Sequence, residues 1–372
     1  MLFRSLDTTY VQVKAKEREN TAKKWIIKTF ISLISMMLII GIIIYKVDPF
    51  MYYRLPETNN YKFDQQYCNA GILKNADYDS AIVGSSMVHL FDPQVARDTM
   101  GINPAKLSWG GARPNDLNYL VNEAIKYRDA KTFLFAFDLL FFDSNTTDTS
   151  FERPEYLHDD NKLNDIKYLF NTKTYTSTAY VMAKKILGIQ QESFDIDAIH
   201  TAGYATERFE KESALNYYDM KIESNKERKI PTQEEKEISL KRMKENLHVK
   251  ILSLFEENPQ RDFYVFFPPI SILLWEAEKE YSTDIMLEFK EYAIKEMLNY
   301  DNVKLYDFQN LDDIVLNLDN YKDTIHYSSE ICDEIIRNIS EDKNLITKEN
   351  YKEKVQYLRN MINQFDISQY DR

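Results

Sequence analysis

The fold of this chain is decided by the stretch Ala81-Ile82-Val83-Gly84-Ser85-Ser86. Its apolar half is typical of a short buried strand, which ends at a glycine and presents a serine just beyond its carboxyl end. Open parallel sheets bind their ligands at that edge. About 240 residues later, the stretch Asp323-Thr324-Ile325-His326 places an aspartate three residues before a histidine. Together the two stretches contain the side chains of a Ser-His-Asp acyl-transfer site.

The surrounding sequence alternates between strand and helix patterns. We expect strands over the ranges 80–83, 105–109, 132–138, 262–267 and 303–308. We expect helices near 93–100, 114–127, 233–257, 283–299, from 328 onward, and near 347–364. This alternation implies a mainly parallel sheet with right-handed crossovers. The polar, tyrosine-rich segment of about 143–232 interrupts it and is predicted to be an insertion of helices and loops, with a lid as one interpretation.

Length and composition favour one large α/β domain plus a membrane element. The chain has 372 residues, 44% of them hydrophobic, which is enough for one core but too few for three domains. Only 8 residues are glycine, which excludes collagen-like and glycine-linker classes. Two cysteines, Cys68 and Cys332, match no zinc spacing. We interpret them as free thiols, with a disulfide as the alternative.

A serine hydroxyl becomes a good nucleophile only when a base takes its proton. We predict that Ser86 is the nucleophile, that His326 is the base, and that Asp323 holds the imidazole in the required tautomer. His89 is close to Ser86 in sequence, but its only neighbouring carboxylate is Asp92. Three further histidines lack an obvious partner and are interpreted as structural or surface residues: His158, His200 and His248.

A long apolar segment, 25–45, decides where this chemistry takes place. As a helix its 21 residues span about 31 Å, enough for the hydrocarbon core of a bilayer. Trp25 and Tyr45 stand where interfacial aromatic residues are favoured, and Lys28 can extend to the interface. The leader before the segment is long for a signal peptide, and no A-x-A cleavage site follows. We therefore expect a retained anchor.

Charge predicts the topology. More basic residues precede the apolar segment than follow it, so the positive-inside rule makes 1–24 a cytoplasmic tail. Outside the cell we expect a stalk at 46–78, the main domain at 79–345 and a C-terminal helical segment at 346–372. Removing the 8 Lys+Arg and 3 Asp+Glu of 1–46 from totals of 47 and 59 leaves 39 and 56, a net charge of −17. Such a field repels nucleic acid and other polyanions.

The order of these motifs resembles the SGNH/GDSL hydrolase superfamily over about 78–340. The resemblance implies a three-layer, flavodoxin-like α/β fold. In that pattern the nucleophile is the second residue after the glycine, which is Ser86 here, while Ser85 takes the place often held by Asp. A glycine after the second strand helps to hold the oxyanion, and Gly110 matches it, with Gly111 beside it. The Ser86 amide is the other implied donor.

One block departs from the superfamily pattern. The usual Gly-x-Asn-Asp is missing, and the fourth strand ends in Phe266-Phe267-Pro268-Pro269 instead. This ending and the strand end Phe137-Asp138-Leu139 are similar to the membrane-anchored subgroup that includes DltD and the AlgJ/AlgX-like proteins. A structural role for Asp138 is equally compatible with its position. Arg113 is a candidate for binding an anionic or glycan group, with a surface salt bridge as the alternative.

The resemblance implies an anchored extracellular O-acyltransferase in the cell membrane of a Gram-positive bacterium. It would move an acyl group, most simply acetyl, through a Ser86 acyl-enzyme to a surface glycan or exopolysaccharide. Implied partners are a multispanning membrane-bound O-acyltransferase, the glycan acceptor and a glycan synthase complex, with no cofactor, metal or nucleic acid. The alternatives are an anchored carbohydrate esterase that removes acetyl groups, a DltD-like protein of teichoic acid D-alanylation, and a non-catalytic subunit of a glycan-modification complex.

Overall fold

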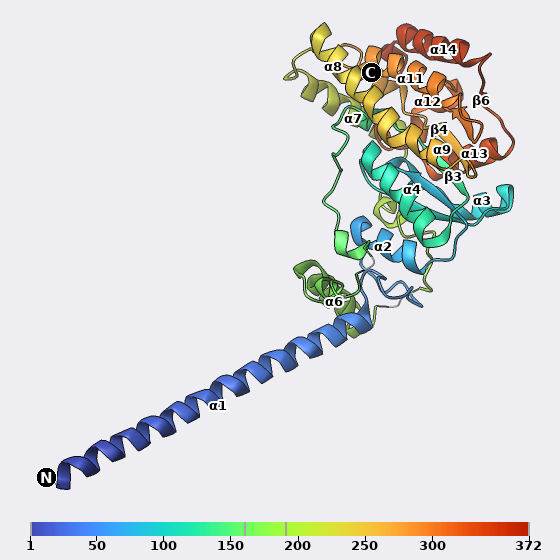
Figure 1. The fold of residues 1–372 in the computed structure, drawn as a ribbon. Coiled ribbons are helices and arrows are strands. Elements are labelled where there is room, and N and C mark those ends of the chain that lie inside the picture. Colours follow the sequence, from blue (N-terminus) through green and yellow to red (C-terminus); the bar gives the residue numbers. More distant parts are fainter. Residues whose placement is uncertain (1, 160, 190–191, 371–372) are drawn as a thin grey trace.

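The computed structural model describes residues 2–159, 161–189 and 192–370, as an α/β domain with a long helix projecting from its base (Figure 1). That helix, α1 (Leu2–Val47), includes the predicted apolar segment. From Tyr10 to Val47 it is long and apolar enough to cross a membrane as a single-pass anchor or a signal sequence, and only 6% of its most apolar window is buried. The predicted tail is not a separate element, because 2–24 continue the same helix.

The domain is built on a six-stranded sheet with the strand order 2-1-3-4-5-6. The first five strands are parallel, as predicted, and the last is antiparallel to its neighbour. They are β1 (Ser80–Gly84), β2 (Pro104–Ser108), β3 (Thr132–Ala136), β4 (Asp262–Phe267), β5 (Val303–Asp307) and β6 (Leu345–Ile346). The sequence pattern missed β6, because two residues are too short for any periodic signal. The order 2-1-3-4-5 is that of flavodoxin-like doubly wound sheets.

Helices cover both faces of the sheet (Figure 1). The chain crosses from β1 to β2 in one direction and from β2 to β3 in the other, so right-handed connections place α3 and α4 on opposite faces. One face is covered by α3 (Pro93–Met100) and by α13 (Ser329–Ser340), which contacts α3. The opposite face is covered by α4 (Pro114–Arg128), by α8 (Gln233–Asn246) and α9 (Ser253–Glu257), which precede β4, and by α11 (Thr283–Met297), which follows it.

Two short helices, α10 (Ile272–Ala277) and α12 (Asp312–Val315), and the longer α14 (Tyr351–Gln364) also belong to the C-terminal half. The predicted amphipathic helix over 233–257 is present, with a π-helical segment, Leu247–Leu252, between α8 and α9. This segment packs on α4, so the irregularity lies where two helices meet.

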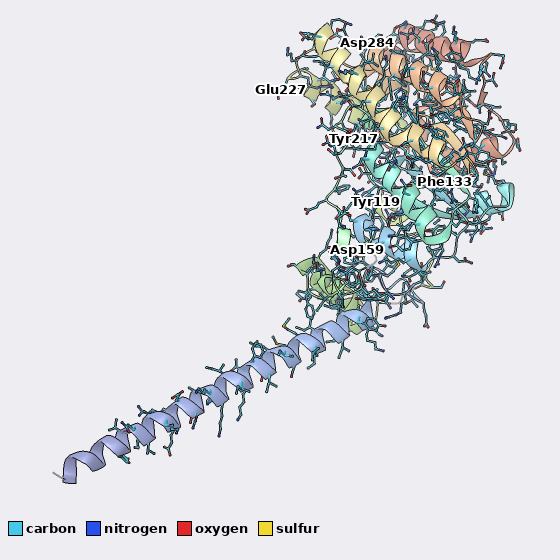
Figure 2. All side chains as sticks on the ribbon, in the orientation of Figure 1. Tyr119, Phe133, Asp159, Tyr217, Glu227 and Asp284 are labelled. Carbon is cyan, nitrogen blue, oxygen red and sulfur yellow. The ribbon has the colours of Figure 1, made fainter. Side chains whose placement is uncertain are left out.

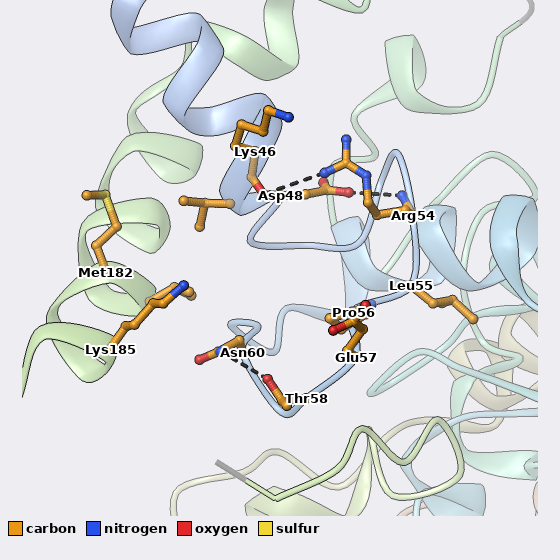
Figure 3. Close-up of a pocket in the computed structure, with 12 residues that line it drawn as sticks. Lys46, Asp48, Arg54, Leu55, Pro56, Glu57, Thr58, Asn60, Met182 and Lys185 are labelled. Atoms are coloured by element: carbon orange, nitrogen blue, oxygen red, sulfur yellow. Dashed lines mark hydrogen bonds between the residues drawn. The ribbon is translucent and has the colours of Figure 1, made fainter. Parts of the chain in front are cut away.

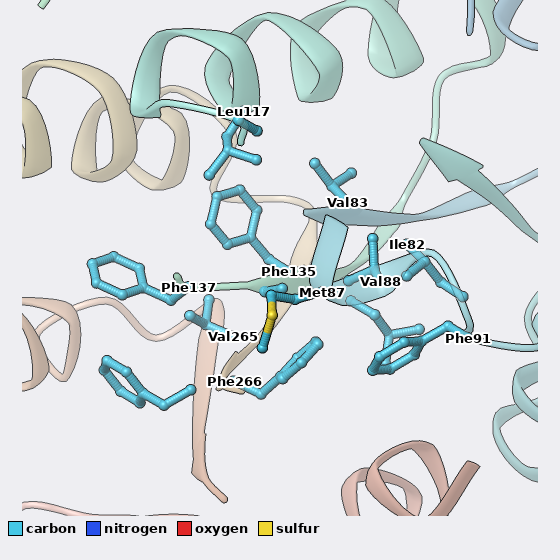
Figure 4. Close-up of a cluster of buried hydrophobic side chains, with 14 of the residues drawn as sticks. Ile82, Val83, Met87, Val88, Phe91, Leu117, Phe135, Phe137, Val265 and Phe266 are labelled. Atoms are coloured by element: carbon cyan, nitrogen blue, oxygen red, sulfur yellow. The ribbon is translucent and has the colours of Figure 1, made fainter. Parts of the chain in front are cut away.

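Apolar side chains of the sheet and of the turn after β1 form the core beneath the predicted serine (Figure 4). Phe91 and Phe266 stack there with ring centroids 5.5 Å apart. Phe133 and Phe263 stack further along the sheet, at 5.1 Å. Figure 2 shows side chains filling the space around the sheet, while those of α1 project from a bare helix. Burying a phenylalanine contributes about 1.5–3 kcal/mol, so this core holds the carboxyl edge of the sheet in place.

The predicted stalk, 46–78, is not a spacer. It packs on the domain, where Phe50 and Met51 are fully buried, and it contains α2 (Gln65–Asn75), whose inner side is buried as well. Gly71 of α2 lies against this backbone, since an added Cβ would come 2.6 Å from the Met51 carbonyl oxygen. The turn-forming residues that suggested a stalk instead allow the chain to fold back beneath the sheet.

The predicted insertion consists of helices and loops in its described parts, apart from a single bridge that pairs Thr58 with Ser193. It has two helical parts. The first, α5 (Ile166–Leu169) and α6 (Thr172–Ile186), lies beside the end of α1 (Figure 1). The second, α7 (Lys211–Asn225), contacts α10 on the domain. Between them, the 3₁₀ turn Thr201–Tyr204 places Tyr204 beside Ser86 at the carboxyl edge of the sheet.

Candidate active site

Ser86 lies where β1 ends and the chain turns at once into a 3₁₀ turn, Ser86–Val88. This tight turn requires the glycine before it. A Cβ added to Gly84 would lie 2.7 Å from the Val88 Cγ1 and 2.9 Å from the Ala136 Cβ. Because β2 and β3 flank β1, the serine stands at the point where the strand order reverses, which is the usual ligand position in such sheets.

Asp323 and His326 lie in a tight loop whose ends are held by an isolated antiparallel bridge between Tyr321 and Tyr327. Within the loop, Asp323 Oδ1 accepts hydrogen bonds from the backbone N–H groups of Ile325, at 2.7 Å, and of His326, at 2.8 Å. The spacing of three residues therefore lets purely local bonds orient the carboxylate.

Folding brings the two stretches into contact. Ser86 Oγ is 2.8 Å from His326 Nε2, and His326 Nδ1 is 2.7 Å from Asp323 Oδ2. A carboxylate accepts the hydrogen of Nδ1, which leaves Nε2 free to accept the serine proton. The three residues are thus placed as a nucleophile, a base and a group that orients the base.

The carboxylate is charged. Burial acts to raise the pKa of Asp323, but hydrogen bonds from the His326 ring and from two backbone N–H groups outweigh it, and the pKa lies below its ordinary value. An ionised Asp323 can stabilise an imidazolium that forms on His326. Lys322 stands at its outer side, with Nζ 3.7 Å from Asp323 Oδ2.

A buried polar network supports the turn that carries Ser86. Ser85 Oγ donates to Asp138 Oδ2 at 2.9 Å and accepts from the Met87 N–H at 3.3 Å. Ser108 Oγ donates to the Ser85 carbonyl at 2.9 Å. Burial raises the pKa of Asp138, whose other oxygen caps the turn after β3 at the Leu140 N–H. Among the two roles open to Asp138, these bonds favour the structural one.

The predicted oxyanion donor Gly110 is already occupied. Its N–H donates to Gln65 Oε1 at 2.8 Å, and Gln65 is the first residue of α2. Gly110 therefore offers no free amide in this conformation, and its predicted role as an oxyanion donor would require this bond to break. The Ser86 N–H differs, because it stands at the first position of its 3₁₀ turn, where an N–H has no partner within the turn. No local sequence signal places Gln65 here, since the contact depends on how α2 folds back.

The insertion covers the site through Tyr204. Its ring lies 6.2 Å from that of His326, centroid to centroid. Together with Leu90 and Tyr327 it closes a pocket of about 10 Å³ over Ser86 and His326. This volume has room for roughly one water molecule. The position of Tyr204 agrees with the lid interpretation of the insertion, but the residue itself was not singled out from the sequence.

Two other histidines form a separate cluster behind Tyr204. His89 Nδ1 is 3.2 Å from the Tyr204 hydroxyl, and the His89 ring stacks on His200 at 5.5 Å. His200 Nε2 is 3.3 Å from the Lys106 carbonyl oxygen. Burial lowers the pKa of His89 to about 3 and that of His200 well below its ordinary value. Asp92, the carboxylate nearest to His89 in sequence, instead caps α3 at the N–H of Gln94.

The remaining histidines lie elsewhere. His158 is buried, with Nδ1 3.5 Å from Glu123 Oε2. His248 is exposed and hydrogen-bonds to the Tyr292 hydroxyl at 2.7 Å. Neither residue reaches Ser86 through any recorded contact, in agreement with the structural and surface roles expected of them.

Arg113, the candidate for substrate binding, is the residue before α4, and its guanidinium pairs with Asp148 at 3.1 Å. It is not among the residues that line the pocket over Ser86. The salt-bridge alternative therefore describes its position in this structure, and its role in substrate binding stays a prediction.

Both cysteines are free and fully buried, as the sequence analysis preferred. Within 2–159, 161–189 and 192–370, no three His, Cys, Asp or Glu side chains lie together in a way that could hold a metal ion.

Comparison with known proteins adds no family to this picture: no protein-family model matches the chain, and no curated protein matches its sequence. The site is therefore interpreted from its own geometry.

Proposed function

We propose that this protein is a membrane-anchored O-acyltransferase with an SGNH-like domain, which acylates a cell-surface glycan or exopolysaccharide on the outer side of the membrane. The observation that carries the proposal is the continuous hydrogen-bonded series Ser86–His326–Asp323 at the carboxyl edge of the sheet. Residues 240 positions apart reach bonding distance with the orientation that acyl transfer requires.

The proposed reaction has two balanced halves. Ser86 Oγ attacks the carbonyl of an acyl donor while His326 Nε2 takes the serine proton and passes it to the leaving group. The product is an ester on Ser86. A sugar hydroxyl then attacks that ester, gives its proton to His326, and leaves as the O-acyl sugar when the proton returns to Ser86. Asp323 stabilises the charged imidazole in both halves.

The tetrahedral intermediate needs hydrogen-bond donors for its oxyanion. The Ser86 N–H has no partner in its turn and can supply one. Gly110 can supply a second only after its bond to Gln65 breaks. We infer that substrate entry displaces the Gln65 side chain, since the oxyanion would replace Gln65 Oε1 as the acceptor of the Gly110 N–H hydrogen bond.

The size of the pocket and the position of α1 support the rest of the proposal. The pocket over Ser86 has room for only about one water molecule, which limits hydrolysis of an acyl-enzyme, and movement of Tyr204 would admit the acyl donor and the sugar. An anchor would hold the domain beside a multispanning acyltransferase that delivers the acyl group through the membrane, which raises the effective concentration of donor and site.

The direct test uses the full chain in detergent with p-nitrophenyl acetate, with and without a soluble polysaccharide. We expect mass spectrometry to find one acetyl group on the peptide that contains Ser86, and to find acetyl esters on the glycan. Ser86→Ala should abolish both products. The comparison variant is Ser85→Ala, which removes a neighbouring hydroxyl that supports the turn and should slow the reaction but still leave an acetyl group on Ser86.

Other outcomes identify the other functions. Acetate release without glycan acetylation would indicate an esterase, because water would be the acceptor. Labelling of Ser86 by a D-alanyl donor but not by an acetyl donor would indicate a teichoic acid D-alanylation protein. If no acyl group reaches Ser86 and glycan modification in cells survives Ser86→Ala, the protein is a non-catalytic subunit and the proposal fails.

A further inference from the structure

Helix α6 presents an apolar side to its surroundings. Its buried side consists mostly of hydroxyl residues, namely Thr174, Ser177 and Thr178, with Val181. Its exposed side has the large apolar residues Tyr175, Met182 and Ile186, and Leu187, directly after the helix, is also exposed. Ile186 is 79% exposed and Leu187 is 74% exposed. A surface helix of a water-soluble domain normally buries its apolar stripe, so the arrangement of α6 is the reverse of the expected one.

The position of α5 and α6 relative to α1 explains the reversal. Both lie beside the end of α1 (Figure 1). An added Cβ on Gly41 would lie 3.4 Å from the Phe170 ring and 3.9 Å from Leu169. Gly41 precedes Tyr45, the last residue of the apolar segment, by about 6 Å along the helix. A bilayer that α1 spans up to Tyr45 would therefore also contain the residues between α5 and α6.

Charge separates this region from the rest of the domain. Residues 161–189 contain five lysines and one aspartate, whereas 47–372 as a whole have 39 basic and 56 acidic residues. Lys184 and Lys185 lie in the last turn of α6, near its exposed apolar residues. Lys185, Lys46 and Arg54 line a pocket of about 510 Å³ between α6, the end of α1 and the segment 54–60, to which Asp48 and Glu57 also contribute (Figure 3). A basic rim beside an apolar surface is the pattern of helices that lie in an anionic membrane interface.

We propose that α5 and α6 form a second membrane contact, with α6 lying in the interface of the bilayer that α1 enters, its exposed apolar side chains among the acyl chains and its lysines at anionic lipid headgroups. The occupant of this surface is lipid. The contact holds the base of the domain against the membrane, which α1 alone, as a single projecting helix, does not do. This inference is independent of the proposed acyl transfer.

The test places an environment-sensitive NBD label on α6 in the full chain, reconstituted in nanodiscs of phosphatidylcholine and phosphatidylglycerol. Cys68 and Cys332 are buried and leave Ile186→Cys as the labelled thiol, with Leu187→Cys as a second variant. The matched control is Ile238→Cys on α8, 48% exposed. Lipids with a doxyl quencher on the acyl chain should quench the label on α6 several-fold more than the control, and its emission should shift to the blue.

Three results would overturn the proposal. Equal quenching at 186, 187 and 238 would show that α6 faces water. Protection of the label only after a membrane protein fraction is added would assign the surface to a protein partner instead of lipid. If the double variant Lys184→Glu, Lys185→Glu leaves the quenching unchanged in discs with phosphatidylglycerol, the lysines do not contact anionic headgroups.

Discussion

His326 contacts Tyr204 directly and His200 is connected to it through His89, but the two histidines lie in opposite chemical surroundings. His326 has a carboxylate on one ring nitrogen and a serine hydroxyl on the other. His200 is buried, hydrogen-bonds to the Lys106 carbonyl oxygen and packs against the rings of Phe63 and His89. Tyr204 connects the two places, since its ring faces His326 and its hydroxyl reaches His89.

The difference teaches what makes a histidine useful for catalysis. An imidazole can take a proton during a reaction only if its charged form is stabilised, and a neighbouring carboxylate does this. Burial without a carboxylate has the opposite effect, because desolvation disfavours the charged form. The same residue type is therefore a base at 326 and a neutral packing element at 200.

The largest effect is expected from replacing Ser86 or His326. Ser86→Ala and His326→Ala should each lower the acyl-transfer rate by about four to six orders of magnitude, as removal of a nucleophile or base does in serine hydrolases. Rates with p-nitrophenyl acetate measure this. His248→Ala, which alters an exposed histidine, should stay near the wild-type rate. Comparable losses in all three variants would break the distinction between the histidines.

The second effect concerns the carboxylate. Asp323→Asn keeps an oxygen that can accept the Ile325 and His326 amide hydrogens, so the loop should fold as before. The amide no longer stabilises an imidazolium, and we expect turnover to fall by about 10⁴-fold. Circular dichroism should show an unchanged fold. A loss of less than tenfold would mean that Asp323 does not support His326 as a base.

The third effect is on stability and distinguishes the buried histidines. The folded-state pKa of His200 lies below its ordinary value near 6.5, so the unfolded chain binds the extra proton as the pH falls. Stability is then complete above about pH 6.5 and decreases below it, by about 1.4 kcal/mol per pH unit for one histidine. His89, with a pKa lowered to about 3, adds a second such contribution.

Urea unfolding of the wild type and of His200→Gln between neutral and mildly acid pH measures this slope. Because glutamine does not titrate, we expect the slope of unfolding free energy against pH to be smaller in the variant by about 1.4 kcal/mol per pH unit. An identical slope in both proteins would show that His200 is charged in the fold, and the contrast with His326 would disappear.

The smallest effect is expected at Tyr204, which lies between His326 and the buried pair of His89 and His200. Tyr204→Phe removes the hydroxyl near His89 but keeps the ring beside His326. We expect a loss of about 1 kcal/mol in stability, typical of one hydrogen bond, and a change in turnover of less than tenfold. Thermal unfolding and the esterase rate give both values. A large loss of activity would show that the tyrosine hydroxyl takes part in the reaction.

Much of this comparison is visible in local sequence patterns. The parallel strands, the helices between them and the glycine before Ser86 all follow from short-range periodicity and from a tight turn. The Asp323–His326 pair is local as well, since its bonds lie within a few residues. The apolar segment of α1 is recognisable from composition alone.

Other features arise from contacts between distant segments and have no local signature. The stalk prediction was wrong because the burial of Phe50 depends on the docking of α2. The same docking brings Gln65 to the Gly110 amide, and the loop of the insertion brings Tyr204 over the site. The partner of Arg113, Asp148, could not be assigned from the sequence, because it lies in a loop without periodicity.

Residue order and periodicity were enough to define the α/β plan, the apolar helix and the loop that orients His326, because hydrogen bonds and apolar spacing within a few residues create them. The contact between Ser86 and His326, the occupied Gly110 amide and the exposed apolar side of α6 required the folded chain. Each of them depends on which surfaces meet after folding, and residues 45 positions apart, as Gln65 and Gly110 are, or 240 positions apart, as Ser86 and His326 are, meet only through packing of the whole domain.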